Sequence, residues 1–186
     1  MATISADDET PTRRDFIHIW AAGAAAVGAG AVAWPFIDQM NPDASVLALA
    51  SVEVDLSAVE VGQGIKVTWR GKPVFIRRRT AAEIEEAKAV EQGDLKDPQT
   101  DDERVIEGPN GALQSEWLVL VGICTHLGCV PLGTSDGESK GDYGGWFCPC
   151  HGSHYDTSGR IRKGPAPGNL EVPEYAFLSD TRIKIG

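Results

Sequence analysis

Two boxes of this 186-residue sequence, CTHLGC (residues 124–129) and CPCHGS (residues 148–153), contain all four of its cysteines and two of its four histidines. Thiolate is a soft ligand and imidazole a borderline one, and together they suit a tightly held transition metal. The boxes therefore predict a metal centre that is formed where the two stretches meet.

The spacing within the boxes separates the candidate centres. A c-type haem needs C-x-x-C-H, and the second box has one residue too few between Cys148 and Cys150. A structural zinc site could use two cysteines and two histidines, and would leave two cysteines over. A Rieske [2Fe–2S] centre has two cysteines on one iron and two histidines on the other, and would take Cys124, His126, Cys148 and His151. Zinc and [2Fe–2S] both stay open on spacing.

The two boxes resemble the signature of Rieske iron–sulfur proteins, in particular the Rieske subunit of the cytochrome bc1 complex (ubiquinol–cytochrome c reductase). Residues 71–79 (GKPVFIRRR), the loop 164–167 (GPAP) and an N-terminal apolar segment are also similar to the bacterial members. The resemblance implies a mainly β fold: an antiparallel β-sandwich head of Rieske type with a small cluster-binding subdomain (117–168). It also implies one [2Fe–2S] cluster as the cofactor.

The resemblance assigns roles to the cysteines and histidines of the boxes. It implies four iron ligands, with Cys124 and Cys148 on the inner iron and His126 and His151 on the outer iron. It pairs the two other cysteines, Cys129 and Cys150, in a disulfide that ties the boxes together. Because disulfides persist in oxidising compartments, this pairing implies that the head lies outside the cytoplasm.

Four further roles also follow from the resemblance. Ser153 matches a serine that donates a hydrogen bond to a bridging sulfide, and Tyr155 matches a tyrosine that donates to a cysteine sulfur. Both donors stabilise the reduced cluster and raise its potential. His151 matches the residue that accepts a hydrogen bond and a proton from quinol, and Leu127 belongs to an apolar collar around that contact.

The implied function is that of the electron-transfer subunit of a proton-translocating quinol–cytochrome c oxidoreductase. The head would take one electron and one proton from ubiquinol, move, and pass the electron to cytochrome c1. Cytochrome b, cytochrome c1, ubiquinol and the membrane are the implied partners, in a complex expected to be dimeric. The alternatives are the Rieske subunit of another periplasmic enzyme such as an arsenite oxidase, a soluble Rieske ferredoxin, and a zinc-stabilised binding module.

Residues 16–37 contain no Asp, Glu, Lys or Arg, and Trp20 and Trp34 lie near the two ends of this stretch. As a helix, these 22 residues would be about 33 Å long, which is enough to cross a bilayer core, and aromatic residues are typical of the interfaces. Arg13 and Arg14 precede the span, so the positive-inside rule keeps the first residues in the cytoplasm. We expect an uncleaved transmembrane anchor.

The residues around the anchor complete the expected organisation. Thr12-Arg13-Arg14-Asp15-Phe16 resembles a twin-arginine export signal, which implies a cytoplasmic N-terminus (1–15). Residues 38–51 are expected to form a flexible tether, and residues 52–186 a periplasmic head. The chain is therefore expected to be a single-pass protein of the bacterial inner membrane.

Hydrophobic patterning predicts short strands in the head and one helix. Residues 51–56 and 182–185 alternate, 65–69 and 73–77 flank a hairpin turn at 70–72, and 117–121 are expected to form a buried strand. Thr80 and Glu83 form a capping-box pattern before a helix at 81–92, and Gly93 is expected to end it.

Composition excludes two classes of protein. With 42% hydrophobic and 24% charged residues, the chain is not disordered throughout. A formal net charge of −10 argues against a nucleic-acid-binding protein, which normally has a basic face. Much of that charge falls in residues 81–107, for which a solubilising loop is favoured over a surface that steers a basic partner.

Two other polar features, a run of three arginines and one histidine, are not assigned to the metal centre. Arg77-Arg78-Arg79 is interpreted as a strand end on a solvated face, or alternatively as a docking patch. His154 is interpreted as a loop residue, because the four iron ligands are already supplied by the boxes.

Overall fold

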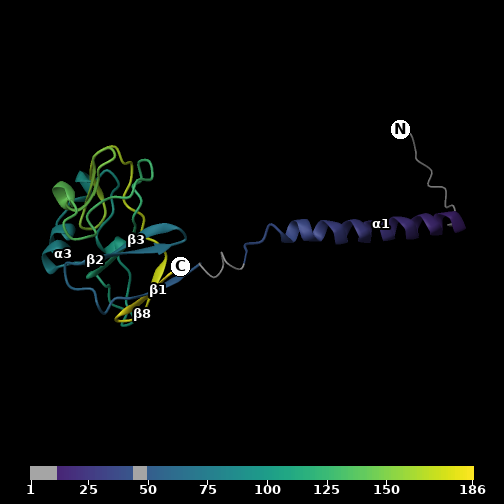
Figure 1. Cartoon of the computed structure of the whole chain (residues 1–186), viewed down its shortest axis with the longest axis horizontal. Helices are drawn as coiled ribbons and strands as arrows, with labels where there is room; N and C mark the ends of the chain where they lie inside the picture. Colours follow the sequence, from purple (N-terminus) through teal and green to yellow (C-terminus); the bar gives the residue numbers. More distant parts are fainter. Residues whose placement is uncertain (1–11, 44–49) are drawn as a thin grey trace, which may run out of the picture. The chain divides into compact units, whose positions relative to one another are not determined.

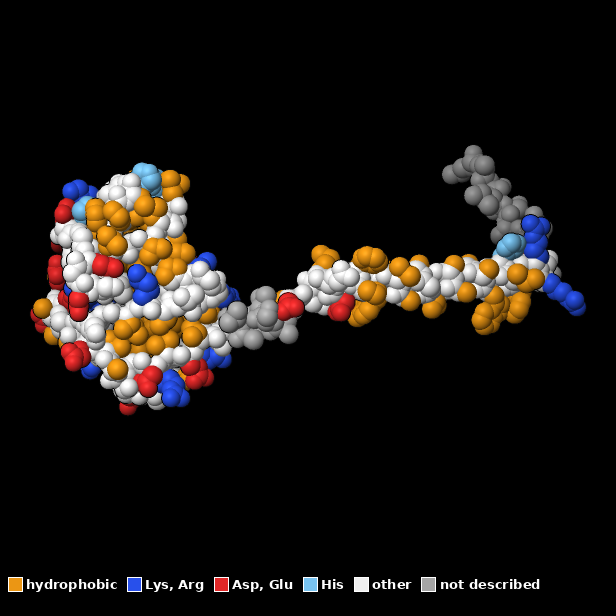
Figure 2. Space-filling view, viewed as in Figure 1, with side chains coloured by type: hydrophobic (Ala, Val, Ile, Leu, Met, Phe, Trp, Pro, Cys, Tyr) orange, Lys and Arg blue, Asp and Glu red, His pale blue; other side chains and the backbone are white. Residues whose placement is uncertain are grey.

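The N-terminal unit is a single helix, α1 (Arg13–Asp38), in the computed structural model, which describes residues 12–43 and 50–186 (Figure 1). It is 26 residues long and contains an 18-residue window with a mean hydropathy of 1.6, so it is long and apolar enough to cross a membrane. A capping box formed by Thr12 and Asp15 starts the helix, and its large apolar side chains are exposed along its length (Figure 2). The expected helix is confirmed. The expected N-terminal segment (1–15) and tether (38–51) lie partly outside the described residues.

The head, described over residues 50–186, forms three antiparallel sheets of three strands each. The first has the order β1 (Val52–Asp55), β9 (Arg182–Ile185), β8 (Tyr175–Ser179). The second has the order β2 (Gly64–Trp69), β3 (Lys72–Arg78), β4 (Trp117–Val121). The third has the order β5 (Gly144–Cys148), β6 (Ser153–Asp156), β7 (Ile161–Lys163). The expected mainly β, antiparallel fold is confirmed.

The β2–β3 hairpin closes through a two-residue turn, one residue shorter than the expected 70–72. Arg70 and Gly71 both have positive φ, 49° and 74°, which is the conformation of a type I′ turn. This turn matches the twist of the flanking strands and sets Trp69 opposite Lys72 in the ladder.

Strand β4 is buried on both faces, which explains its unbroken apolar sequence. Leu118 and Leu120 pack with Phe75 in one core cluster, and Trp117 and Val119 belong to the other. The second sheet therefore has a core on each side. Residues 117–121 pair with β3, so the third sheet takes up only the later part of the expected subdomain at 117–168.

Helix α3 (Ala81–Lys88) has the expected capping box between Thr80 and Glu83 but ends earlier than predicted. The carbonyl of Ala87 accepts a hydrogen bond from the buried guanidinium of Arg160 at 2.7 Å. In a longer helix this carbonyl would instead accept from the backbone N–H of Glu91, which has an extended conformation here. Three 3₁₀ turns complete the head: η1 (Gln92–Asp94), η2 (Asp102–Arg104) and η3 (Gly141–Tyr143).

The interpretation of Arg77–Arg79 as solvated or docking residues is wrong for Arg77 and Arg79, whereas Arg78 is 32% exposed and pairs with Glu116. Arg77 and Arg79 are 3% and 1% exposed. Arg77 pairs with Glu83, and Arg79 pairs with Asp101, with the Arg79 Nη1 to Asp101 Oδ1 distance at 2.5 Å. The acidic segment is therefore more than a solubilising loop, because two of its carboxylates neutralise buried arginines of the β3 end.

Candidate metal centre

The two boxes form matching turns. In each, the carbonyl of a cysteine (Cys124 or Cys148) accepts a hydrogen bond from the N–H of the glycine four residues later, at 3.0 Å. The glycines, Gly128 and Gly152, have φ of 79° and 74°, a left-handed conformation that residues with a Cβ rarely adopt. A glycine at this place is therefore required for both turns, although the two sequences differ between cysteine and glycine.

These turns send cysteines inward and histidines outward. Cys124 and Cys148 are each 2% exposed, whereas His126 is half-buried and His151 is exposed. The two imidazole rings lie edge to face, with their centroids 4.6 Å apart. The four expected ligands thus form two pairs, a buried pair of thiols and a more accessible pair of imidazoles.

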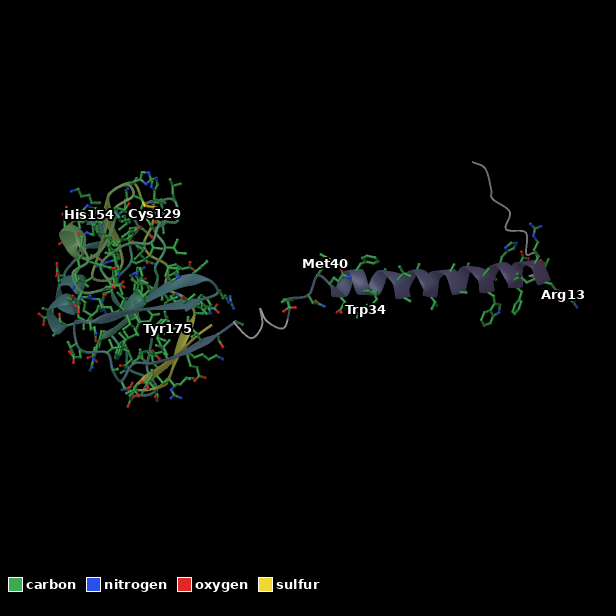
Figure 3. The ribbon with its side chains drawn as sticks, in the orientation of Figure 1. Arg13, Trp34, Met40, Cys129, His154 and Tyr175 are labelled. Atoms are coloured by element: carbon green, nitrogen blue, oxygen red, sulfur yellow. A yellow bond between two sulfur atoms is a disulfide. The ribbon has the colours of Figure 1, made fainter. Side chains whose placement is uncertain are left out.

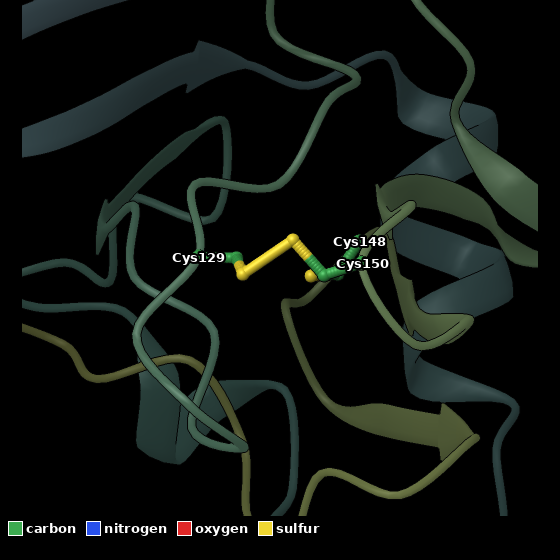
Figure 4. A group of neighbouring side chains, drawn as sticks. All are labelled: Cys129, Cys148 and Cys150. Carbon is green, nitrogen blue, oxygen red and sulfur yellow. A yellow bond between two sulfur atoms is a disulfide. The ribbon is translucent and has the colours of Figure 1, made fainter.

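A disulfide joins the boxes, as expected. It links Cys129 to Cys150, whose Cα atoms are 6.8 Å apart (Figure 4). The sulfur of Cys148 lies near this bridge, with the three Sγ atoms all within 4.8 Å of one another. Because two of these sulfurs are already bonded to each other, Cys148 alone of the three keeps a thiol.

The surroundings of the buried thiols change the pKa values of Cys148 and Tyr155. Burial raises the pKa of the Cys148 thiol, and the neighbouring sulfur of Cys124 adds to the rise. The Tyr155 hydroxyl donates to Sγ of Cys124 at 3.2 Å. Burial and this hydrogen bond also raise the pKa of Tyr155, so the phenol stays a donor. A buried thiolate needs a cation beside it, and a bound metal supplies one.

The loop at 164–169 closes over both boxes. Ala166 is fully buried, and its N–H donates to the Ser153 hydroxyl oxygen at 3.2 Å. The Thr125 hydroxyl donates to the carbonyl of Gly168 at 2.6 Å. The loop therefore contacts each box through one hydroxyl.

The end of the head that carries the two boxes has apolar side chains on its surface near His126 and His151. Leu127 and Val130 are 71% and 43% exposed, and Figure 2 shows histidine atoms beside hydrophobic ones at this end. Cys129 and His154 lie toward the same end, and Tyr175 lies away from it (Figure 3).

His154 lies on strand β6, so its interpretation as a loop residue is wrong. Its Nδ1 accepts the backbone N–H of Asp142 at 3.0 Å, and its ring contacts Phe147. These contacts hold His154 in the sheet, and it is not part of the His126–His151 pair.

Two thiols and two imidazoles, brought together by two equivalent turns, fit a [2Fe–2S] cluster with mixed ligands. The disulfide accounts for the remaining cysteines. The sequence of residues 59–176 matches the Rieske [2Fe-2S] domain, and that of residues 3–43 matches the "Ubiquitinol-cytochrome C reductase Fe-S subunit TAT signal" family. The chain belongs to the iron–sulfur subunits of ubiquinol–cytochrome c reductase.

Relatives in this family are similar along the whole chain. The iron–sulfur subunit of Rhodospirillum rubrum is 58% identical over 184 residues, covering 99% of this chain and 97% of the relative. That of Bradyrhizobium diazoefficiens is 56% identical over 187 residues, covering all of both chains. A chain of a hyperthermophilic respiratory Complex III shares the fold, with a TM-score of 0.51 and 24% identity, covering 90% of this chain and 98% of its own. As a member of the family, this Rieske subunit is an oxidoreductase subunit that carries a [2Fe–2S] cluster.

Proposed function

We propose that this Rieske subunit takes electrons from ubiquinol and passes them to cytochrome c1 in the cytochrome bc1 complex. The observation that carries the proposal is the pairing of the two boxes, with buried thiols behind adjacent, accessible imidazoles. The bound cluster would supply a one-electron redox centre at this end of the head.

Four residues would hold the cluster, one cysteine and one histidine from each box. The thiols of Cys124 and Cys148 would bind the inner iron and the imidazoles of His126 and His151 the outer iron. Burial of the thiols and exposure of His151 support this order, because the inner ligands are shielded from water and the outer ones can reach a partner.

Two hydroxyls would tune the potential. The Tyr155 hydroxyl already donates to the sulfur of Cys124. The Ser153 hydroxyl oxygen accepts from Ala166, so its own proton is available to a bridging sulfide. Donors to sulfur stabilise the reduced cluster, which carries more negative charge, and so raise the midpoint potential.

His151 would also contact the quinol. Its exposed ring can accept a hydrogen bond from a quinol hydroxyl through the nitrogen that does not bind iron, and this nitrogen would hold the proton. Leu127, 71% exposed beside His126, would form part of an apolar collar that keeps water from the contact.

The organisation of the chain would follow from this role. Helix α1 would anchor the subunit in the bacterial inner membrane, residues 38–51 would be the tether, and the head would lie in the periplasm against cytochrome b and cytochrome c1 of a dimeric complex. The Trp69 indole donates to the carbonyl of Ala50 at 2.8 Å, which supports a head that begins at this point of the chain. The disulfide supports an oxidising compartment.

The test is low-temperature EPR of the dithionite-reduced subunit in membranes that contain the complex. We expect a rhombic signal whose average g value is below that of the free electron. The variant His151→Gln should abolish this signal. His154→Gln is the matched control, because it changes a histidine at the same end of the head and should leave the signal intact. Zinc in place of iron, or a signal that survives His151→Gln, would contradict the proposal.

The topology is tested separately. Arg13→Lys together with Arg14→Lys should stop export, and protease added to spheroplasts should then no longer reach the head. Protease-sensitive heads in this double variant would argue against a twin-arginine signal.

A further inference from the structure

The loop 164–169 touches the boxes on one side and the acidic segment on the other. On the box side it is held by Ser153 and Thr125, and its buried Ala166 shares a core cluster with Cys124 and Cys148. A shift of this loop would therefore disturb the core cluster that contains the expected inner-iron ligands.

Lys96 holds the first half of the loop from the outside. Its ammonium donates to the carbonyl of Gly164 at 2.7 Å and to that of Ala166 at 3.2 Å. Two carbonyls that converge on one ammonium fix the backbone between them, and hydrogen bonds from a charged donor are stronger than neutral ones. The Ala166 N–H lies between these two carbonyls, and it donates to the Ser153 hydroxyl oxygen.

Asp97 holds the second half of the loop. Its carboxylate accepts the backbone N–H of Asn169 at 2.9 Å, and its carbonyl accepts the Asn169 side-chain amide at 3.0 Å. The same amide donates to Gln99, and the Asn169 side-chain oxygen accepts the N–H of Ile161 on β7 at 2.9 Å. Asn169 is 8% exposed, so this is a buried connection between the acidic segment and the third sheet.

We propose that Lys96 and Asp97 are positioning residues for the cluster site, which brace the 164–169 loop so that the Ser153 hydroxyl keeps its direction. The inference rests on the proposed role of Ser153. An N–H that donates to a hydroxyl oxygen polarises the O–H bond and strengthens the hydrogen bond that this hydroxyl donates in turn. Lys96 thus acts on the potential through Ala166 and Ser153, without touching the cluster.

The experiment compares Lys96→Met with wild type in the assembled, cluster-containing complex, using two readouts. Hydrogen exchange should show the Ala166 amide exchanging about tenfold faster, because a charge-assisted clamp is lost. Redox titration by EPR should show a lower midpoint potential, with a smaller shift than that of Ser153→Ala. Lys96→Arg should restore both values, because a guanidinium can donate to the same two carbonyls.

Lys163→Met is the matched control for charge. Lys163 directly precedes the loop, and its ammonium pairs with Asp142 at 3.0 Å. Removing it takes the same charge from the same region while the Lys96 clamp stays in place. Both readouts should remain at their wild-type values.

Three results would overturn the positioning role, two of them in Lys96→Met and one in the control variant. One is unchanged exchange in Lys96→Met. The other is faster exchange with an unchanged midpoint potential. An equal fall in potential in Lys163→Met would show an effect of charge alone and would also overturn it. If Ser153→Ala leaves the potential unchanged, the proposed role of Ser153 fails instead, whatever Lys96→Met does to exchange.

Discussion

The hydroxyl of Tyr155 lies 3.2 Å from Sγ of Cys124, and both side chains are buried. Strand β6 carries the tyrosine and the first box carries the cysteine, so the hydrogen bond crosses between the two halves of the site. We expect Tyr155→Phe to lower the midpoint potential by roughly 30–100 mV, because one donor to a charged sulfur is lost. Redox titration by EPR measures the shift. Tyr143→Phe is the control, and an unchanged potential in Tyr155→Phe would refute the role.

The Arg79–Asp101 pair should dominate the stability of the region beyond β3. Both side chains are at most 1% exposed, and Asp101 also accepts from the Ser158 hydroxyl at 2.5 Å. Asp101→Ala leaves a buried guanidinium unpaired, which costs about 3–5 kcal/mol in the free energy of unfolding. Urea denaturation of the head measures the loss. Lys88→Ala removes an ion pair that is about half exposed and should cost less than about 1 kcal/mol.

The same pairs predict how stability depends on pH. Burial acts to raise the pKa values of Asp101 and Glu83, but the hydrogen bonds and charges of Arg79 and Arg77 outweigh it, so both values lie below their ordinary 3.8 and 4.5. The stability that these carboxylates contribute is therefore complete above those ordinary values and is lost as pH falls through the lowered ones. Thermal unfolding should occur at a steady temperature near neutrality and at lower temperatures below about pH 4. Asp101→Asn should flatten this acid dependence, and an equally steep dependence in that variant would exclude Asp101 as its source.

Removing the disulfide should loosen the boxes. The bridge closes a loop with a sequence separation of 21, for which the chain-entropy model gives about 3 kcal/mol. We expect Cys129→Ser with Cys150→Ser to lower the unfolding temperature and to lose iron faster to a chelator. Wild-type protein treated with a reductant should behave in the same way. Equal iron retention in the double variant, the reduced wild type and the untreated wild type would show that the turns hold the site without the bridge.

Local patterns in the sequence predicted local structure well. The capping box of Thr80 and Glu83, the β2–β3 hairpin and the buried strand β4 each depend on residues that are close together in the chain, and all three are confirmed. The pairing of the two boxes was predictable too. Their spacing fitted either zinc or a [2Fe–2S] cluster, and the resemblance favoured the cluster.

Contacts between distant residues were not predictable in this way. Arg79 lies at the end of a strand, where a charged residue normally meets water, and its partner is one of ten acidic residues in 81–107. Nothing in the local sequence distinguishes Asp101 from its neighbours. The early end of α3 has the same origin, since the guanidinium that takes the Ala87 carbonyl belongs to Arg160, 73 residues away.

Accessibility divides the four cysteines of this chain into two groups. Cys124 and Cys148 are shut off from the medium, while Cys150 is exposed and Cys129 partly so. A dissolved thiol reagent or oxidant therefore meets the bridge-forming sulfurs first, although all four side chains are chemically the same. In a chain whose cysteines are still reduced, burial alone would direct oxidation toward the correct pair and protect the other two for metal.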